Sequence, residues 1–574
     1  MRWLRNLLIG FVAGFMAIVG AQAADMPLKA KPVEYVKICS LYGAGFYYLP
    51  GTDICVKWGA YVRFQPFYAH GSSPTNGPFQ GAAAQATNFI GTQNDLVMRS
   101  RGIYTMDART QTEYGTLRSY ILIGFEENTP SNQPGASGAT LFARRGFIQF
   151  AGFTLGKATS FYEVFSNSAN SYYSLNTPDT GSSGDLVAAY TYQFGNGFSA
   201  TISAEDPRRA SVVNTSISGG NAAVPCAAVP IGGFGGNACA NPFTVGAVPT
   251  ADQAQIRWPD IVANLRVDQA WGSLQLMGAL HDTTGGYFVP SVGVTCNIGA
   301  FGGTLTGQLA CGHPSDELGF AVGAGGVLKI PMPTGLTDIA SFQVTYTEGA
   351  IRYVDFSRPG SGSPDFFSST GLATCPSAPV PANSAANGLN TPTCLGSLGI
   401  GYYTDAVYAN PGTLLGYNGS VQTTRAWGVA AAWDHSWTPD LKTSVYGTLN
   451  QFDYNATAEQ LISLATCGTS GTAANTVTRM TNVAGPPGIT GAGVRFLSCS
   501  PDFSIWQIGS RTQWNITSSF YVGFDVKYQK LETAFAGNAF FLAATGLPRP
   551  SGDYQIKDQD IVSFTARAQW NILP

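Results

Sequence analysis

The feature that most constrains the fold is a regular alternation of connection lengths between short amphipathic segments. Sixteen segments of this chain alternate apolar and polar side chains, which is the period of a β-strand with different media on its two faces. The fifteen connections between them are alternately short and long. Short turns at one end and long loops at the other are typical of antiparallel strands that close through a membrane. The pattern therefore predicts an all-β fold, a closed antiparallel transmembrane β-barrel of sixteen strands.

The predicted strands have the length of about ten residues that a tilted membrane-crossing strand needs. They cover residues 56–67, 95–109, 113–126, 141–151, 153–160, 185–194, 197–205, 257–267, 272–281, 318–331, 338–349, 423–435, 440–453, 503–515, 519–530 and 560–572. In the first of them Val62 and Phe64 share one face, and Tyr61 and Arg63 share the other. We therefore expect apolar residues on the lipid side and polar residues in the lumen.

Composition supports the same reading. Only 11% of the residues are charged, whereas soluble domains carry about a quarter, so water does not cover the whole surface. After residue 24 no stretch offers the roughly 20 apolar residues of a membrane helix, which leaves the closed barrel. The net charge of -3 argues against nucleic acid as a partner.

The first residues have the three parts of a secretory signal peptide. A basic start at Arg2 and Arg5 precedes an apolar run over 7–19 and the small-residue site Ala21-Gln22-Ala23. We expect residues 1–23 to be removed on export. Residues 24–55 then form a periplasmic N-terminal segment that leads into the barrel of residues 56–574.

The ten cysteines fall into five sequential pairs. They are Cys39 with Cys55, Cys226 with Cys239, Cys296 with Cys311, Cys375 with Cys394, and Cys467 with Cys499. Outside the cytoplasm this pattern predicts disulfides that staple individual segments, although the connectivity does not follow from sequence. A metal site is the alternative, but no pair has C-x-x-C spacing and no histidine cluster completes a ligand set. We expect neither a metal nor another cofactor.

Residues 161–184 form a long polar connection, rich in Ser, Asn and aromatic residues, between two predicted strands. Loops of that length are usually functional or disordered. We expect this one to fold into the lumen and narrow it, with an ordinary surface loop as the alternative. The other large loops, at 206–256, 282–317, 350–422, 454–502 and 531–559, resemble low-complexity coil.

Strand alternation places a row of arginines on the lumen face. The row comprises Arg63, Arg99, Arg101, Arg118, Arg145 and Arg567, with Arg511 two strands away. The loop opposite contributes Glu163, Asp179 and Asp185. Arginines facing carboxylates across a constriction sort solutes by charge and dipole. The alternative is that single arginines pair locally, with Asp107 or Glu126.

Other functions find less support in the residues. A hydrolase needs a nucleophile, a histidine base and an orienting group, and no such spacing occurs around the four histidines. We therefore expect no enzyme. Adhesion through the long loops is compatible with a pore, and a sugar-selective pore would use lumen-facing rings such as Tyr61, Tyr120 and Tyr446.

Three stretches amount to a resemblance to a known family. They read PLKAKPVEYVKICSLYGAGFYYLPGTDICVKWGAYVR (27–63), DARTQTEYGTLRSY (107–120) and FIQFAGFTLGKATSFYEVF (147–165). In these the chain resembles the general-diffusion porins of alphaproteobacteria. The resemblance implies a sixteen-stranded barrel in the outer membrane, assembled as a homotrimer, with its third loop folded inward.

The resemblance also implies a function, namely passive diffusion of small hydrophilic solutes and ions. A substrate-selective porin, for anions or sugars, is the alternative. Two features depart from the family: the external loops are long, and the chain ends Trp570-Asn-Ile-Leu-Pro574 rather than on an aromatic residue.

Overall fold

The structure is a computed structural model of the whole chain. It describes residues 38–69, 96–128, 139–173, 177–181, 183–216, 256–288, 312–356, 365–368, 373–374, 393–394, 396–467, 477–483, 492–541 and 552–573. The predicted signal peptide lies outside the described residues.

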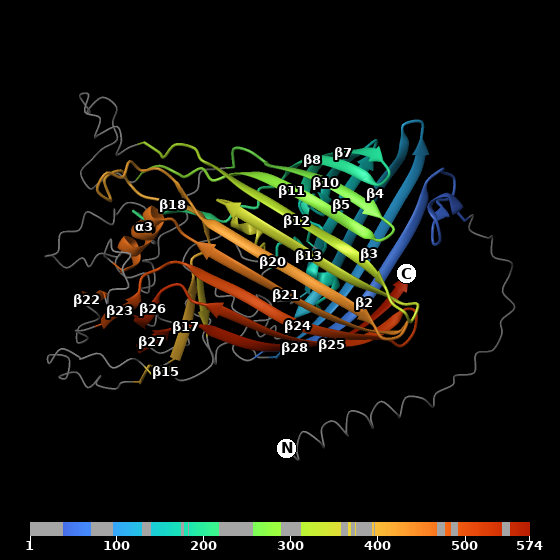
Figure 1. Cartoon of the computed structure of the whole chain (residues 1–574). Helices are drawn as coiled ribbons and strands as arrows, with labels where there is room; N and C mark the ends of the chain where they lie inside the picture. The colour runs from blue at the N-terminus through green and yellow to red at the C-terminus, as the bar shows by residue number, and fades with distance from the viewer. Residues whose placement is uncertain are drawn as a thin grey trace, which may run out of the picture.

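Sixteen antiparallel strands close into a barrel, as predicted (Figure 1). In chain order they are β2 (Cys55–Ala69), β3 (Leu96–Thr112), β4 (Gly115–Asn128), β5 (Ala139–Phe150), β6 (Phe153–Ala158), β7 (Asp185–Gly195), β8 (Phe198–Glu205), β10 (Asp260–Gln269), β11 (Gly272–Asp282), β12 (Leu318–Pro331), β13 (Thr337–Glu348), β20 (Arg425–Ser436), β21 (Leu441–Asp453), β24 (Phe503–Asn515), β25 (Phe520–Glu532) and β28 (Gln559–Leu573). Each pairs with its sequence neighbour in this series, and β28 closes the sheet on β2 with Gln569 opposite Arg63. The barrel therefore has no free edge.

The two ends of the barrel differ. The short turns and both described chain ends lie at one end, which we call the turn end. Helix α3 (Ala456–Cys467) and strand β18 (Thr404–Tyr408), which belong to the large loops, lie at the other, the loop end (Figure 1). Two of the turns have successive residues at positive φ, Ala151 (49°) with Gly152 (88°) and Asn196 (51°) with Gly197 (78°). This is the backbone of a tight hairpin turn whose twist matches the strands.

A few strand bounds differ from the prediction. Strand β10 begins at Asp260 rather than at residue 257, because Pro259 has no N–H to donate to the ladder. Strand β20 begins at Arg425, because Gln422–Thr423 (β19) pairs with another segment.

The expectation that the large loops are coil was wrong. Strand β18 (Thr404–Tyr408) pairs with β9 (Ser211–Asn214) and β19, and a further six-stranded sheet joins β14 (Asp365–Ser368), β17 (Gly396–Gly401), β22 (Val477–Val483), β23 (Ala492–Ser498), β26 (Ala536–Phe541) and β27 (Gly552–Ile556). Helix α3 spans Ala456–Cys467. These strands are short and mostly joined across long sequence separations, so local periodicity gives little sign of them. None of the described helices is long and apolar enough to cross a membrane.

An apolar core fills part of the barrel at the loop end, and we call it the mouth core. Inward-facing Phe67, Phe452 and Phe503 of the strands contribute to it, together with Tyr402 and Tyr403 of the loop before β18. The rings of Phe452 and Phe503 stack with centroids 4.5 Å apart, and the Tyr403 ring lies 4.9 Å from each. Loop segments are thus packed into the barrel by the same burial that builds a soluble core.

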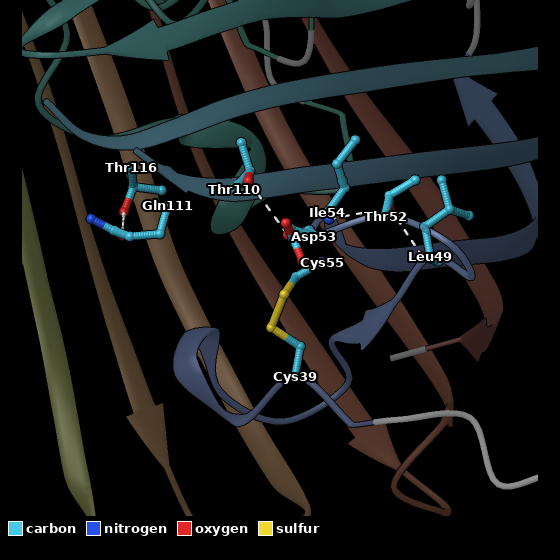
Figure 2. The surroundings of a disulfide bond; sticks show 9 residues. All are labelled: Cys39, Leu49, Thr52, Asp53, Ile54, Cys55, Thr110, Gln111 and Thr116. Atoms are coloured by element: carbon cyan, nitrogen blue, oxygen red, sulfur yellow. Dashed lines mark hydrogen bonds between the residues drawn. A yellow bond between two sulfur atoms is a disulfide. The ribbon is translucent and has the colours of Figure 1, made fainter. Parts of the chain in front are cut away.

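The N-terminal segment is fastened to the turn end. Strand β1 (Tyr47–Tyr48) pairs with the start of β2, and a disulfide joins Cys39 to Cys55 with 5.9 Å between their Cα atoms (Figure 2). This predicted pair is confirmed.

The other four predicted cysteine pairs stay predictions. Cys499 is disulfide-bonded, but the side chain of its predicted partner Cys467 lies outside the described residues. The same holds for the side chains of both members of the remaining three pairs, which are Cys226 with Cys239, Cys296 with Cys311, and Cys375 with Cys394. The structure therefore describes one of the five predicted bridges, and the connectivity in the large loops is left to peptide mapping without reduction.

Candidate functional site

The lumen face of the wall carries the predicted arginines. On β2, Val62 and Phe64 are 47% and 49% exposed on the outside, so the half-buried Arg63 between them points inward. Strands β28, β2, β3, β4 and β5 are consecutive neighbours in the barrel. They carry Arg567, Arg63, Arg99 with Arg101, Arg118, and Arg145 respectively. The structure therefore brings these six together on one side of the lumen.

Three arginines of β2 and β3 have unequal partners. Arg101 forms an ion pair with Glu126 on β4, as the local-pairing alternative expected. Arg63 Nε instead donates to the amide oxygen of Gln569 at 2.8 Å, and Arg99 Nε donates to the amide oxygen of Asn128 at 2.7 Å. Amide oxygens are neutral, so they leave the charge of both guanidinium groups uncancelled.

Arg144 is a lumen-facing residue that the sequence reasoning missed. The register between β4 and β5 shifts so that Leu122 pairs with Arg145 and Ile123 with Ala143, which leaves Arg144 as the extra residue of a bulge. A bulge interrupts strict alternation. Arg144 consequently faces the same side as Arg145, with its guanidinium 3.6 Å from Glu126. Two consecutive arginines in the sequence were the only available signal.

Nearer the turn end, two arginines share one carboxylate. Arg109 and Arg118 lie directly opposite each other on β3 and β4, and both donate two hydrogen bonds to the Asp107 carboxylate at 2.8–3.0 Å. The local-pairing alternative is therefore confirmed for Arg118. A cavity of about 430 Å³ lies beside this group, lined among others by Lys57, Tyr61 and Tyr120.

The connection between β6 and β7 lies against inward-facing side chains around most of the wall. Its first limb, residues 161–173, forms hydrogen bonds with five strands. Glu205 of β8 accepts from Phe161 N–H, and Asn264 of β10 donates to the Phe161 carbonyl. Further along, Asn170 donates to Asp434 of β20, Asp525 of β25 accepts from Tyr172 N–H, and Arg567 of β28 donates to the Tyr172 carbonyl. These hydrogen bonds measure 2.6–2.9 Å. Residues 161–173 therefore cross the barrel interior from β8 to β28.

Two more predicted arginines hold this connection. Arg511 of β24 donates to the carbonyl of Ala169, and Arg145 of β5 donates to the carbonyl of Gly181 at 2.9 Å. Gly184 ends the connection with φ +66°, and a Cβ there would lie 1.8 Å from Arg145 Nη1. Only glycine fits this close approach.

The predicted acidic residues of the loop are buried rather than exposed to the lumen. Asp179 and Asp185 are 5% and 8% exposed, and Glu163 is 7% exposed. Glu163 accepts from Arg208 Nη2 at 2.7 Å, and Asp185 lies 3.7 Å from Arg208 Nε. Glu163 and Asp185 therefore lie beside a buried arginine, and Asp179 accepts from Ser166 Oγ at 2.7 Å. None of the three faces the arginine row across open water, which corrects the expected geometry.

Arg208, which the sequence reasoning also missed, ties both limbs of the connection together. It is fully buried, and its Nη1 donates to the carbonyl of Pro178 at 2.9 Å while Nη2 holds Glu163. Its guanidinium lies 4.7 Å from the centroid of the Tyr353 ring. Burial raises the pKa of Glu163 to about 7, with Arg208 acting in the opposite direction and Asp179 adding to the rise. Residue 208 belongs to a segment expected to be coil, so nothing in the sequence singled it out.

A second buried polar group fastens the loop end. His281 Nδ1 lies 2.7 Å from Asp260, and His281 Nε2 lies 3.4 Å from Asp405, which is on β18. Asp405 also accepts from the backbone N–H groups of Ala210 and Ile351. Within the described residues no group of three or more His, Cys, Asp or Glu side chains is arranged to hold a metal ion.

Comparison with known proteins decides the family. The model of a porin subfamily matches residues 25–565 of the chain. The chain belongs to this porin subfamily. This porin is an outer-membrane protein that crosses the bilayer with its sixteen strands, and the family indicates a channel rather than an enzyme.

The curated relatives include porins of the predicted bacterial group. Porin Omp2b of Brucella melitensis biotype 1 is 29% identical over 211 residues, which are 35% of this chain and 54% of that protein. Porin Omp2b of Brucella suis biovar 1 is 28% identical over 211 residues, with the same coverage. The porin thus spans about half the length of the curated relatives it matches.

Solved structures that align with this porin do so at low identity. The alignment with the outer membrane channel DcaP of Acinetobacter baumannii covers 92% of this porin and 99% of that chain at 11% identity, with a TM-score of 0.46. The alignment with an anion-selective porin from Comamonas acidovorans covers 90% of this porin and 100% of that chain at 10% identity, with a TM-score of 0.37.

Proposed function

We propose that this porin forms a water-filled channel for the passive diffusion of small hydrophilic solutes and ions. The observation that carries the proposal is the closed barrel with an arginine-bearing lumen face, crossed by residues 161–173. In this account the connection 161–184 sets the narrowest section, because its hydrogen bonds reach from β8 round to β28. Export through the signal peptide of residues 1–23 and assembly as a homotrimer complete the proposal.

The proposed selectivity is a modest preference for anions. Arg63, Arg99 and Arg145 are half-buried and have no carboxylate within ion-pair distance among the described residues, whereas the loop acids are buried. Mobile salt screens such fixed charges over about 10 Å at 0.1 M. The preference should therefore fade as the salt concentration rises.

Single-channel recording in planar bilayers tests the proposal. The purified porin is expected to produce discrete conductance steps, and a variant lacking residues 161–184 is expected to produce larger steps and a higher solute size limit. The size limit is measured from the swelling rate of liposomes in sugars of increasing mass. Absence of conductance in the wild type contradicts the channel, and an unchanged conductance in the deletion contradicts the constriction.

A further inference from the structure

Two pairs of arginines stand directly opposite each other on neighbouring strands of the lumen wall. Arg109 pairs with Arg118 across β3 and β4, and Arg63 pairs with Arg101 across β2 and β3. Like charges in directly opposed positions of a sheet destabilise it. Each pair therefore needs negative charge nearby.

The pair nearer the turn end shows how the wall meets this need. Asp107 accepts two hydrogen bonds from Arg109 and two from Arg118, so one carboxylate bridges both guanidinium groups. Two-pronged contacts of this kind are the preferred geometry between arginine and a carboxylate or phosphate.

The other pair lacks a bridging carboxylate. Glu126 is engaged by Arg101 and lies 3.6 Å from Arg144, and no carboxylate in the described part of the chain lies within ion-pair distance of Arg63 or Arg99. Each of these two uses Nε to reach a neutral amide, Gln569 or Asn128, which fixes the plane of the guanidinium group. In the described residues their terminal nitrogens donate to no protein acceptor.

Aromatic rings support the two guanidinium groups from one side. Arg63 lies over the ring of Tyr61 at 4.9 Å from the centroid, and Arg99 lies over the ring of Tyr173 at 5.8 Å. Stacking and the Nε hydrogen bonds hold both forks in place before any solute arrives, which lowers the entropy lost on binding. Tyr173 belongs to the connection 161–184, so this point lies where the proposed constriction meets the arginine row.

We propose that Arg63 and Arg99 form a binding site for the oxyanion group, carboxylate or phosphate, of a permeating solute. The oxyanion accepts from two forks that are one inward-facing position apart on β2 and β3, because Arg63 lies opposite Arg101 and Arg99 lies opposite Gln65. The site rests on the proposed channel function and deepens it, because it names the class of anion that the basic wall retains longest. Chloride is a single atom and cannot form two-pronged contacts with both guanidinium groups, so it binds to this site less tightly than an oxyanion does.

The test is the effect of oxyanions on chloride current through single channels in about 0.1 M KCl, where fixed charges are still felt over about 10 Å. Inorganic phosphate and malonate are added in separate experiments, with glycerol at equal osmolarity as the uncharged control. Both anions are expected to reduce the KCl conductance in a saturable manner, and glycerol is not.

The variants locate the effect. Arg63→Gln/Arg99→Gln is expected to raise the half-effect concentration about tenfold, while the matched control Arg118→Gln changes it by less than about twofold. Arg63→Lys/Arg99→Lys keeps the charge but loses the planar guanidinium groups. Its half-effect concentration should therefore lie between those of the wild type and the double glutamine variant. It also serves as the test if the glutamine variant fails to assemble.

Three results overturn the site. They are a conducting wild-type channel with no saturable oxyanion effect, equal half-effect concentrations in the wild type and the Arg63/Arg99 variants, and a larger shift in Arg118→Gln. A response to phosphate but not to malonate restricts the site to phosphate, and the reverse restricts it to carboxylates. A wild type that forms no channel overturns the proposed function itself, and the site with it.

Discussion

Arginines on the inside of this porin have two opposite roles, shown by Arg208 on one hand and by Arg63 and Arg99 on the other. Arg208 is fully buried, contacts Glu163 and the carbonyl of Pro178, and is shut off from water. Arg63 and Arg99 are half-buried and contact neutral amides. A buried arginine with carboxylates around it is costly to remove and is shielded from ions, whereas a half-buried one without them keeps its charge available to ions. The fixed charge that a permeating ion meets therefore depends on burial and pairing and not on the number of arginines.

The largest expected effect follows from removing the buried member of this comparison. Arg208→Met leaves Glu163 and Asp185 without their cation, and breaking a buried ion pair typically costs about 3–5 kcal/mol. We expect a lower free energy of unfolding in urea and, because Arg208 joins both limbs of the connection 161–184, noisier and larger conductance steps. Arg208→Met/Glu163→Leu should recover part of the stability. Unaltered channel noise in a folded Arg208→Met variant would show that Arg208 does not hold the connection.

A disulfide at the opposite end of the barrel separates stability from selectivity. Cys39 and Cys55 are 16 residues apart, and closing a loop of this size contributes about 3 kcal/mol in the chain-entropy model. Cys39→Ser/Cys55→Ser is therefore expected to lower the free energy of unfolding by up to that amount, which is measured as a lower midpoint in denaturant. Its conductance and ion selectivity should equal those of the wild type. A changed selectivity would mean that loss of stability alone alters the pore, and the comparison between the arginine groups would lose its meaning.

The pH dependence of the buried group is a smaller effect with a defined sign. Burial raises the pKa of Glu163 to about 7, above that of an exposed glutamate. The folded protein therefore binds the Glu163 proton more tightly than the unfolded chain does. Stability contributed by Glu163 is full below the ordinary glutamate pKa and declines as the pH rises through about 7. Arg208, Asp179, Asp185 and Arg145 are the charged groups around it.

Thermal unfolding between about pH 5 and about pH 8 measures this effect. The wild type should lose stability relative to Glu163→Gln as the pH rises, because glutamine has no proton to release. Parallel curves for the two proteins would show that Glu163 does not titrate in this range.

The sequence predicted the wall far better than it predicted what fills it. Strand period and connection length depend on local alternation, which is why all sixteen strands, the turns at Gly152 and Gly197, and the lumen side of Arg63, Arg99 and Arg567 were predicted correctly. Arg144 was missed because a bulge breaks that alternation. Arg208, His281 and the mouth core depend on contacts between segments far apart in the chain, which leave no periodic signal.

The acidic loop shows the limit most clearly. Glu163 and Asp179 were correctly placed on the connection between β6 and β7, but whether a carboxylate faces water depends on the partner that the fold supplies. For Glu163 that partner is Arg208, which lies 45 residues further along the chain, beyond two strands.

The measurement that tests the central claim most directly is the reversal potential across a KCl gradient at low salt. The wild type is predicted to be weakly anion-selective, and Arg63→Gln/Arg99→Gln is predicted to move the permeability ratio towards cations. Arg118→Gln should move it much less, because it removes one charge instead of two and leaves Arg109 paired with Asp107. If the double variant and Arg118→Gln shift the reversal potential equally, or neither shifts it, the half-buried arginines do not set the field in the pore.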